Sequence, residues 1–70
     1  MNDKEEIEKL SKEDAFYRLI AGFHEQRIID DKISIADREF HARKLNYYKS
    51  KYEETSEQIT QIYKRNKNCN

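Results

Sequence analysis

The sequence predicts an all-α protein, and three observations lead to that fold class. The 70 residues contain no proline and a single glycine, Gly22, so the turn residues on which strand-rich proteins depend are almost absent. Charged residues make up 40% of the chain, a composition that suits long solvated helices. Apolar residues recur at the three- and four-residue spacing of an α-helix. We therefore expect an antiparallel helical hairpin with a short N-terminal helical extension.

The length of the chain limits the core that it can build. Seventy residues form at most one domain, and a chain this short buries only roughly 60% of its unfolded surface. Small chains in this range often gain stability by association. We therefore expect residues 1–70 to form a single small helical domain that assembles with a second copy into a dimeric four-helix bundle.

The N-terminal part of the chain carries two possible helix starts. Asp3 could cap a helix, and the acidic residues after it are favoured there by the helix dipole. Ser11, followed three residues later by Asp14, is a weaker version of a capping box. We expect a break or a frayed turn near Ser11, so that an extension over residues 1–11 precedes a first main helix over residues 12–29.

Residues 15–23 are the only dense apolar block of the sequence. Its large apolar side chains are spaced as on one helical face, and a second apolar stripe runs beside them. One partner helix cannot cover both stripes, so two helices of the chain or a second chain are expected to cover the block. The first stripe contains Phe16, Leu19, Ile20 and Phe23, and the second contains Ile7, Leu10, Tyr17, Ala21, His24 and Ile28.

Residues 30–34 are the expected turn. Asp30 and Asp31 can satisfy free backbone groups, and Ser34 followed by Asp37 has the pattern of a helix cap. An alternative is a small β-hairpin that pairs residues 28–29 with residues 33–35, although an isolated hairpin is barely stable in water.

The second helix is expected over residues 34–66, because nothing in this range breaks a helix. Six of its residues are spaced 3, 4, 3, 4 and 3 apart, which is the seam of a heptad repeat. The seam is rich in tyrosine, which favours packing in an antiparallel bundle over an autonomous coiled coil. The seam residues are Leu45, Tyr48, Tyr52, Thr55, Ile59 and Ile62.

The two main helices are expected to differ in length, so the second should overhang the first unless residues 3–11 also pack along it. The overhang carries Ile59, Ile62 and Tyr63, and apolar residues on an unpaired overhang invite another chain. The residues that we expect in the core, within the chain or between copies, are Phe16, Leu19, Ile20, Phe23, Ile28, Phe40, Leu45, Tyr48, Tyr52, Ile59 and Ile62. Residues 67–70 are expected to be a disordered tail.

No pattern in the sequence predicts an enzyme, a cofactor or a metal centre. A single glycine cannot supply a phosphate-binding loop. His24 and His41 could approach each other across a hairpin that turns near residue 32, with Glu25 or Glu39 beside them, but no local ligand motif accompanies them. Two seam or surface histidines are therefore the preferred interpretation. The lone Cys69 cannot form an internal disulfide, which is typical of a reducing compartment.

The function that we expect is that of a small non-catalytic protein-interaction module, an adaptor or a regulator that binds another protein through helical surfaces. The partner is a different protein, a second copy in a homodimer, or both. No membrane-spanning stretch or signal peptide is visible, so we expect a cytoplasmic protein. The expected interface residues are Phe16, Leu19, Ile20, Phe23, Ile59, Ile62 and Tyr63.

The alternative function is that of a small nucleic-acid-binding regulator. Four basic residues of the second helix surround tyrosines, and such a pattern can bind phosphates and stack on bases. Against it, the formal net charge of the chain is zero, whereas nucleic-acid-binding domains are usually basic. The residues of this alternative are Arg43, Lys44, Lys49 and Lys51.

Overall fold

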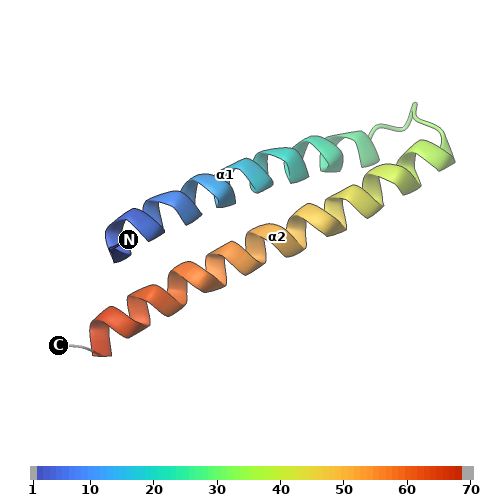
Figure 1. Cartoon of the computed structure of the whole chain (residues 1–70). Helices are drawn as coiled ribbons and strands as arrows, with labels where there is room; N and C mark the ends of the chain where they lie inside the picture. Colours follow the sequence, from blue (N-terminus) through green and yellow to red (C-terminus); the bar gives the residue numbers. More distant parts are fainter. Residues whose placement is uncertain (1, 69–70) are drawn as a thin grey trace.

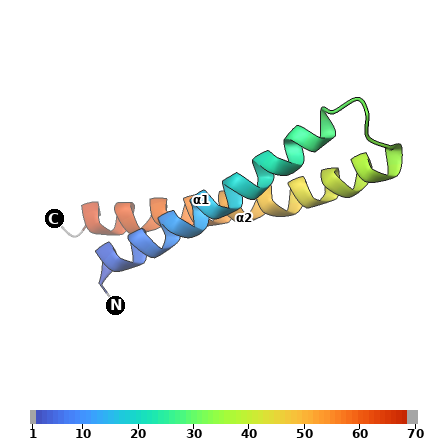
Figure 2. The ribbon, with the colours of Figure 1, turned by 90° about the horizontal axis from the view of Figure 1, so that it is seen from above.

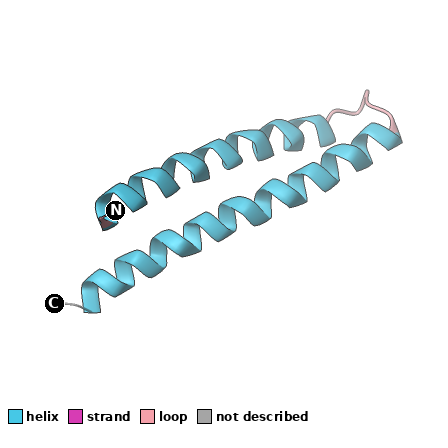
Figure 3. Cartoon of the chain, viewed as in Figure 1, coloured by secondary structure: helices cyan, strands magenta, loops and turns pink. Residues whose placement is uncertain are grey.

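The chain folds into two long helices joined by a short connection (Figure 1). The structure is a computed structural model that describes residues 2–68. Helix α1 spans Asp3–Ile28 and helix α2 spans Ile35–Asn68, and the two pack side by side in antiparallel directions. No strand occurs among residues 2–68 (Figure 3). The predicted all-α hairpin is confirmed, and the alternative β-hairpin is wrong.

The hairpin is a rod that measures 54 × 16 × 15 Å. Its length follows from α2, because 34 residues rising 1.5 Å each span about 51 Å. Seen from above, α1 crosses α2 at a shallow angle (Figure 2). A rod of two helices exposes most of its circumference, so the way in which each helix is rotated decides which side chains are available to a partner.

Helix α1 is continuous through Ser11, so the predicted break there is wrong and no separate extension exists. The helix begins after Asn2, whose side-chain Oδ1 accepts a hydrogen bond from the Glu5 backbone N–H at 2.8 Å. The cap is therefore Asn2 rather than Asp3. Because α1 packs against α2 along its whole length, it gains nothing from restarting at Ser11.

The connection between the helices is closed by local polar contacts. Asp30 Oδ1 accepts a hydrogen bond from the Lys32 backbone N–H at 2.9 Å. Ser34 Oγ accepts one from the Asp37 backbone N–H at 3.1 Å, which confirms the predicted cap. Helix α2 then continues to Asn68, two residues beyond the predicted end. The predicted disordered tail over residues 67–70 is therefore wrong for residues 67 and 68, and residues 69–70, which include Cys69, lie outside the described residues.

The predicted seam of α2 faces α1. Thr55 and Ile62 are buried, and the other four members of the seam are half-buried. Helix α1 packs against this seam with its second stripe, in which Leu10, Ala21 and His24 are buried. This stripe continues through positions spaced 4, 3, 4, 3 and 4 apart, which are Leu10, Asp14, Tyr17, Ala21, His24 and Ile28.

The first stripe of α1, expected in the core within the chain or between copies, is not buried inside the hairpin. Phe16, Leu19 and Phe23 are 59%, 75% and 57% exposed, and only Ile20 is half-buried. Phe40 on α2, also expected in the core, is exposed as well. The first stripe spans only two turns, whereas the second runs along most of α1, so pairing through the second stripe makes the longer contact with α2.

The predicted overhang is also absent, because the two helices end together. Arg65 Nη2 lies 2.9 Å from Asp3 Oδ1, which places the start of α1 against the last turns of α2. Ile62 is buried inside the hairpin at 4% exposure, and Ile59 is half-buried. Of the three residues expected on the overhang, only Tyr63 is exposed. Neither described helix is long and apolar enough to cross a membrane.

Candidate protein interface

The outward side of α1 carries an apolar stripe that α2 does not cover. We call Phe16, Leu19 and Phe23 the outer stripe, with Ile20 half-buried at its edge. The stripe arises because α1 has two apolar faces and a hairpin can bury only one of them. Scattered exposed apolar residues are ordinary, but three large ones at helical spacing form a continuous strip. This strip is the first element of the candidate interface.

The rings of the outer stripe continue into a network of aromatic contacts between the helices. The Phe16 ring lies 6.0 Å from Tyr17, and Tyr17 lies 6.2 Å from Tyr48 across the hairpin. Phe23 meets His24 edge-on at 5.3 Å and also approaches His41 at 6.2 Å. Aromatic pairs at these separations add to the stabilisation from burial. The exposed rings are therefore held in place by partly buried ones and do not project freely.

His24 and His41 meet at the centre of this network, as a hairpin turning near residue 32 allows. Their Nδ1 atoms are 2.8 Å apart, so one ring donates its N–H and the other accepts. Tyr48 stacks on His24, with the centroids 5.9 Å apart and the ring planes 9° apart. The pKa of His24 is lowered by burial and by the charges of His41 and Lys44. A pair that shares one proton in this way stays closed while at least one ring is neutral.

The histidine pair does not belong to a larger ligand set. Within the described part of the chain, no group of three histidine, cysteine or acidic side chains could hold a metal ion. Glu25 and Glu39, which the sequence placed beside the pair, are both exposed. The pair is surrounded by rings, which makes it a packing element between the helices.

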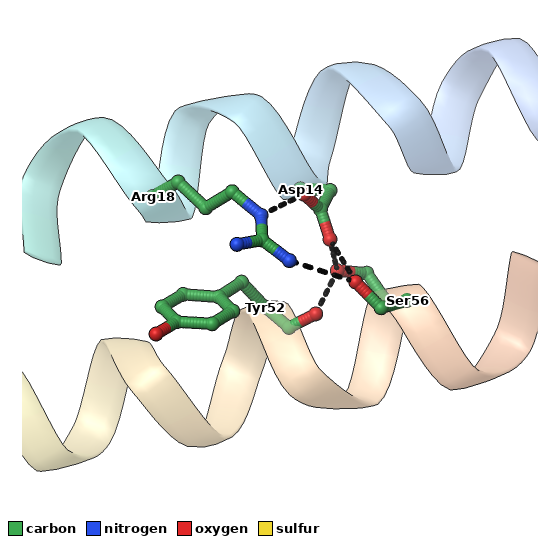
Figure 4. Close-up of polar contacts among 5 residues, drawn as sticks. Asp14, Arg18, Tyr52 and Ser56 are labelled. Atoms are coloured by element: carbon green, nitrogen blue, oxygen red, sulfur yellow. Dashed lines mark hydrogen bonds and ion pairs between the residues drawn. The ribbon is translucent and has the colours of Figure 1, made fainter.

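A second polar cluster ties the helices together nearer the chain termini (Figure 4). Asp14 Oδ2 accepts hydrogen bonds from Ser56 Oγ at 2.7 Å and Thr55 Oγ1 at 2.9 Å, and Asp14 Oδ1 accepts one from Arg18 Nε. Arg18 also donates to Ser56 at 3.1 Å, and its guanidinium lies 4.2 Å from the centroid of the Tyr52 ring. In this cluster, three side chains of α2 (Tyr52, Thr55 and Ser56) contact two side chains of α1 (Asp14 and Arg18).

The electrostatics of Asp14 follow from this cluster. Partial burial alone would raise its pKa, but the hydrogen bonds from Ser56, Arg18 and Thr55 outweigh burial and hold the pKa below its ordinary value. Ser56, Thr55 and Arg18 all donate to this carboxylate, so the arrangement links the two helices. The sequence contained a signal for this cluster, namely the charged Asp14 within the second stripe of α1, but its partners on α2 were not predicted.

The basic residues of the alternative function do not form one face. Lys44 and Lys51 are seven residues apart on α2, which places them on the same side. Lys49 is five residues from Lys44 and therefore lies roughly 140° around the helix, and Arg43 lies roughly 120° from Lys49. Arg43, Lys44 and Lys49 are exposed and Lys51 is half-buried. A phosphate backbone that follows one groove could contact only part of this set.

The structure separates the predicted interface residues into two groups. Phe16, Leu19 and Phe23 lie together on the outside of α1, with Ile20 beside them, whereas Ile59 and Ile62 belong to the seam. Tyr63 is exposed but lies near the other end of the hairpin. The sequence analysis did not name Phe40 or Tyr47 as interface residues, yet both are exposed beside the ring network. Comparisons with protein-family models, curated proteins and solved structures return no significant match to the chain.

Proposed function

We propose that the chain is a small non-catalytic protein-interaction module, an adaptor or regulator that binds another protein through the outer stripe of α1. The observation that carries the proposal is the exposure of three large apolar side chains at helical spacing, on a chain whose buried apolar core consists of Leu10, Ala21 and Ile62. Apolar helix faces of this kind dock into helical partners or apolar grooves. The finer architecture that we propose is a four-helix bundle of two hairpins.

The proposal is tested by placing a charge on the stripe. Leu19 is the most exposed of its residues, so Leu19→Glu should abolish capture of a binding protein from the native lysate while leaving the helicity of the chain unchanged. Ile35→Glu is the matched control, because Ile35 is equally exposed but lies at the start of α2. A protein retained by the wild type and the control but not by Leu19→Glu is then purified and its affinity measured. Equal retention by all three chains would contradict the proposal.

The nucleic-acid alternative is separated from this proposal by salt. Binding to phosphates releases counterions, so the affinity for a mixed-sequence oligonucleotide would fall steeply as salt is raised. It would also be lost when Arg43, Lys44, Lys49 and Lys51 are neutralised together. Binding through the outer stripe should depend less steeply on salt and should be lost in Leu19→Glu, which leaves all four cations in place.

A further inference from the structure

Four exposed aromatic rings lie on one side of the hairpin and come from both helices. Phe16 and Phe23 lie on α1, and Phe40 and Tyr47 lie on α2. That side is marked by the groove lined by Glu13, Tyr17, Lys51, Glu54, Thr55 and Gln58. The α1 rings follow Glu13 by three and ten residues, and the α2 rings precede Lys51 by four and eleven, which are helical repeats. We call the four rings the aromatic face.

The solvent-accessible surface of the chain is larger than that of a typical globular protein of the same mass. It measures 5629 Å², whereas a globular protein of 8.5 kDa exposes about 4,700 Å². The excess of roughly 900 Å² is close to the ~800 Å² that each partner contributes to a standard-size protein interface. One contact of ordinary size would therefore bring the chain to the surface expected for its mass.

The aromatic face also carries cations. Three of its rings have a positive group above them, at distances to the ring centroid of 5.9 Å for Arg27 over Phe23, 5.7 Å for Lys44 over Phe40 and 5.5 Å for Lys51 over Tyr47. None of these three cations forms an ion pair with a carboxylate in residues 2–68. Their charge is therefore available to an acidic partner.

Carboxylates lie further along the same side, towards the chain termini. Glu13 and Glu54 line the groove, and neither takes part in an ion pair within the described chain. Arg27 and Lys44 lie closer to the connection between the helices. The groove also contains Lys51, so its three charged groups carry one net negative charge, whereas Arg27 and Lys44 make the same side basic nearer the connection. A surface with this polarity complements a copy of itself that runs in the opposite direction.

From the exposed rings, the excess surface and the charge polarity, we infer that a second copy of this chain packs on the aromatic face, with the two hairpins antiparallel. The basic end of each hairpin then lies on the acidic end of the other. Such a two-fold contact uses the same residues of both copies. The inference rests on the proposed function, because it identifies the protein partner as the chain itself and adds the orientation of the contact.

Charge reversal tests the contact. The acidic variant replaces Arg27→Glu and Lys44→Glu, and the basic variant replaces Glu13→Lys and Glu54→Lys. Each alone places like charges across the interface, and we expect its dimer dissociation constant to rise about tenfold or more. An equimolar mixture should restore dimers, because one chain then presents acid and the other base at both ends. Solution mass by light scattering measures the outcome, and circular dichroism verifies that each variant keeps its helices.

Two results would overturn the inference. The first is a wild-type chain that stays monomeric up to millimolar concentration, and the second is a mixture that stays as dissociated as either folded variant. If a charge reversal unfolds the chain, the relative orientation of the two copies is measured on chains that carry no charge reversal. Spin labels at Lys4→Cys and Lys32→Cys in a Cys69→Ser background should give a short distance between unlike labels of two copies and a long one between two Lys32→Cys labels. The reverse pattern would exclude the antiparallel arrangement.

Failure of this inference and failure of the proposed function give different results. A monomeric wild type that still captures a protein in a Leu19-dependent way refutes the second copy and leaves the interaction module standing. A monomer that captures nothing refutes both. A dimer that dissociates on charge reversal but is unaffected by Leu19→Glu supports the aromatic face as the contact and removes Leu19 from it.

Discussion

The two halves of the hairpin hold their helices together in different ways. Next to the connection, the contact is made by rings, with His24, His41 and Tyr48 stacked or edge-on across the helices. Nearer the termini, the contact is made by directional hydrogen bonds. Two hydroxyls of α2 donate to Asp14, and Arg65 donates to Asp3. No side chain in residues 2–66 is completely buried in either half.

This difference assigns separate roles to the two halves. Hydrogen bonds to a carboxylate are strict in distance and angle, so the polar half fixes the register in which α1 and α2 align. Aromatic contacts accept several geometries and leave ring edges and faces exposed. We therefore propose that the aromatic half is the part of the hairpin that offers surface to another protein, and that the polar half fixes the alignment of the helices that carry this surface.

The largest effect is expected from breaking the polar half. Asp14→Ala leaves the Ser56 hydroxyl without its acceptor and the Thr55 hydroxyl with only the Tyr52 backbone carbonyl, and we expect it to lower the free energy of unfolding by about 2–3 kcal/mol. Urea denaturation followed by circular dichroism measures the change. Glu8→Ala is the control, since Glu8 is an exposed acid of the same helix. A variant as stable as this control would show that the polar cluster does not hold the register.

A smaller effect is expected from acidifying the aromatic half. Burial, His41 and Lys44 lower the pKa of His24 in the folded chain, so the unfolded chain binds the proton more tightly. The stabilisation is complete above the ordinary value of 6.5 and is lost as the pH falls through the lowered pKa. The free energy of unfolding should therefore decrease between pH 7 and pH 5, a range in which Asp14 stays ionised because its pKa is held below 3.8.

Removal of the titrating ring checks the source of this pH dependence. His24→Gln should flatten the decrease between pH 7 and pH 5, because glutamine carries no proton to gain. Glu25→Gln, next to it and exposed, should leave the slope as in the wild type. If the free energy of unfolding of His24→Gln still decreases between pH 7 and pH 5, another group causes the pH dependence, and the histidine pair does not make the aromatic half sensitive to acid.

The smallest effect is expected at the end of the polar half. Arg65 and Asp3 are 58% and 37% exposed at their side chains, and an ion pair this accessible is worth less than about 1 kcal/mol. Arg65→Ala should lower the melting temperature slightly at low salt and not at all at high salt. Lys64→Ala is the neighbouring control, as an exposed cation. A large, salt-independent loss would place Arg65 in a role beyond this pair.

Much of the fold could be predicted because it depends on local spacing. The heptad seam of α2, the turn before Ser34 and the cap on Asp37 follow from residues close together in the sequence, and the structure confirms each. The orientation of α1 could not be predicted in this way. Both of its stripes have helical spacing, and the one with Phe16 and Phe23 is the more apolar. Apolar content alone therefore does not show which of the two stripes α2 covers.

By itself the sequence determined that the chain forms two helices, where they turn, and that α1 has more apolar surface than one neighbour can cover. The tertiary structure decided which stripe is buried, because Asp14 meets Ser56 and His24 meets His41 only when α2 lies alongside. These pairs are 42 and 17 residues apart in the sequence. Their energy depends on the register of two whole helices, and no local pattern carries that information.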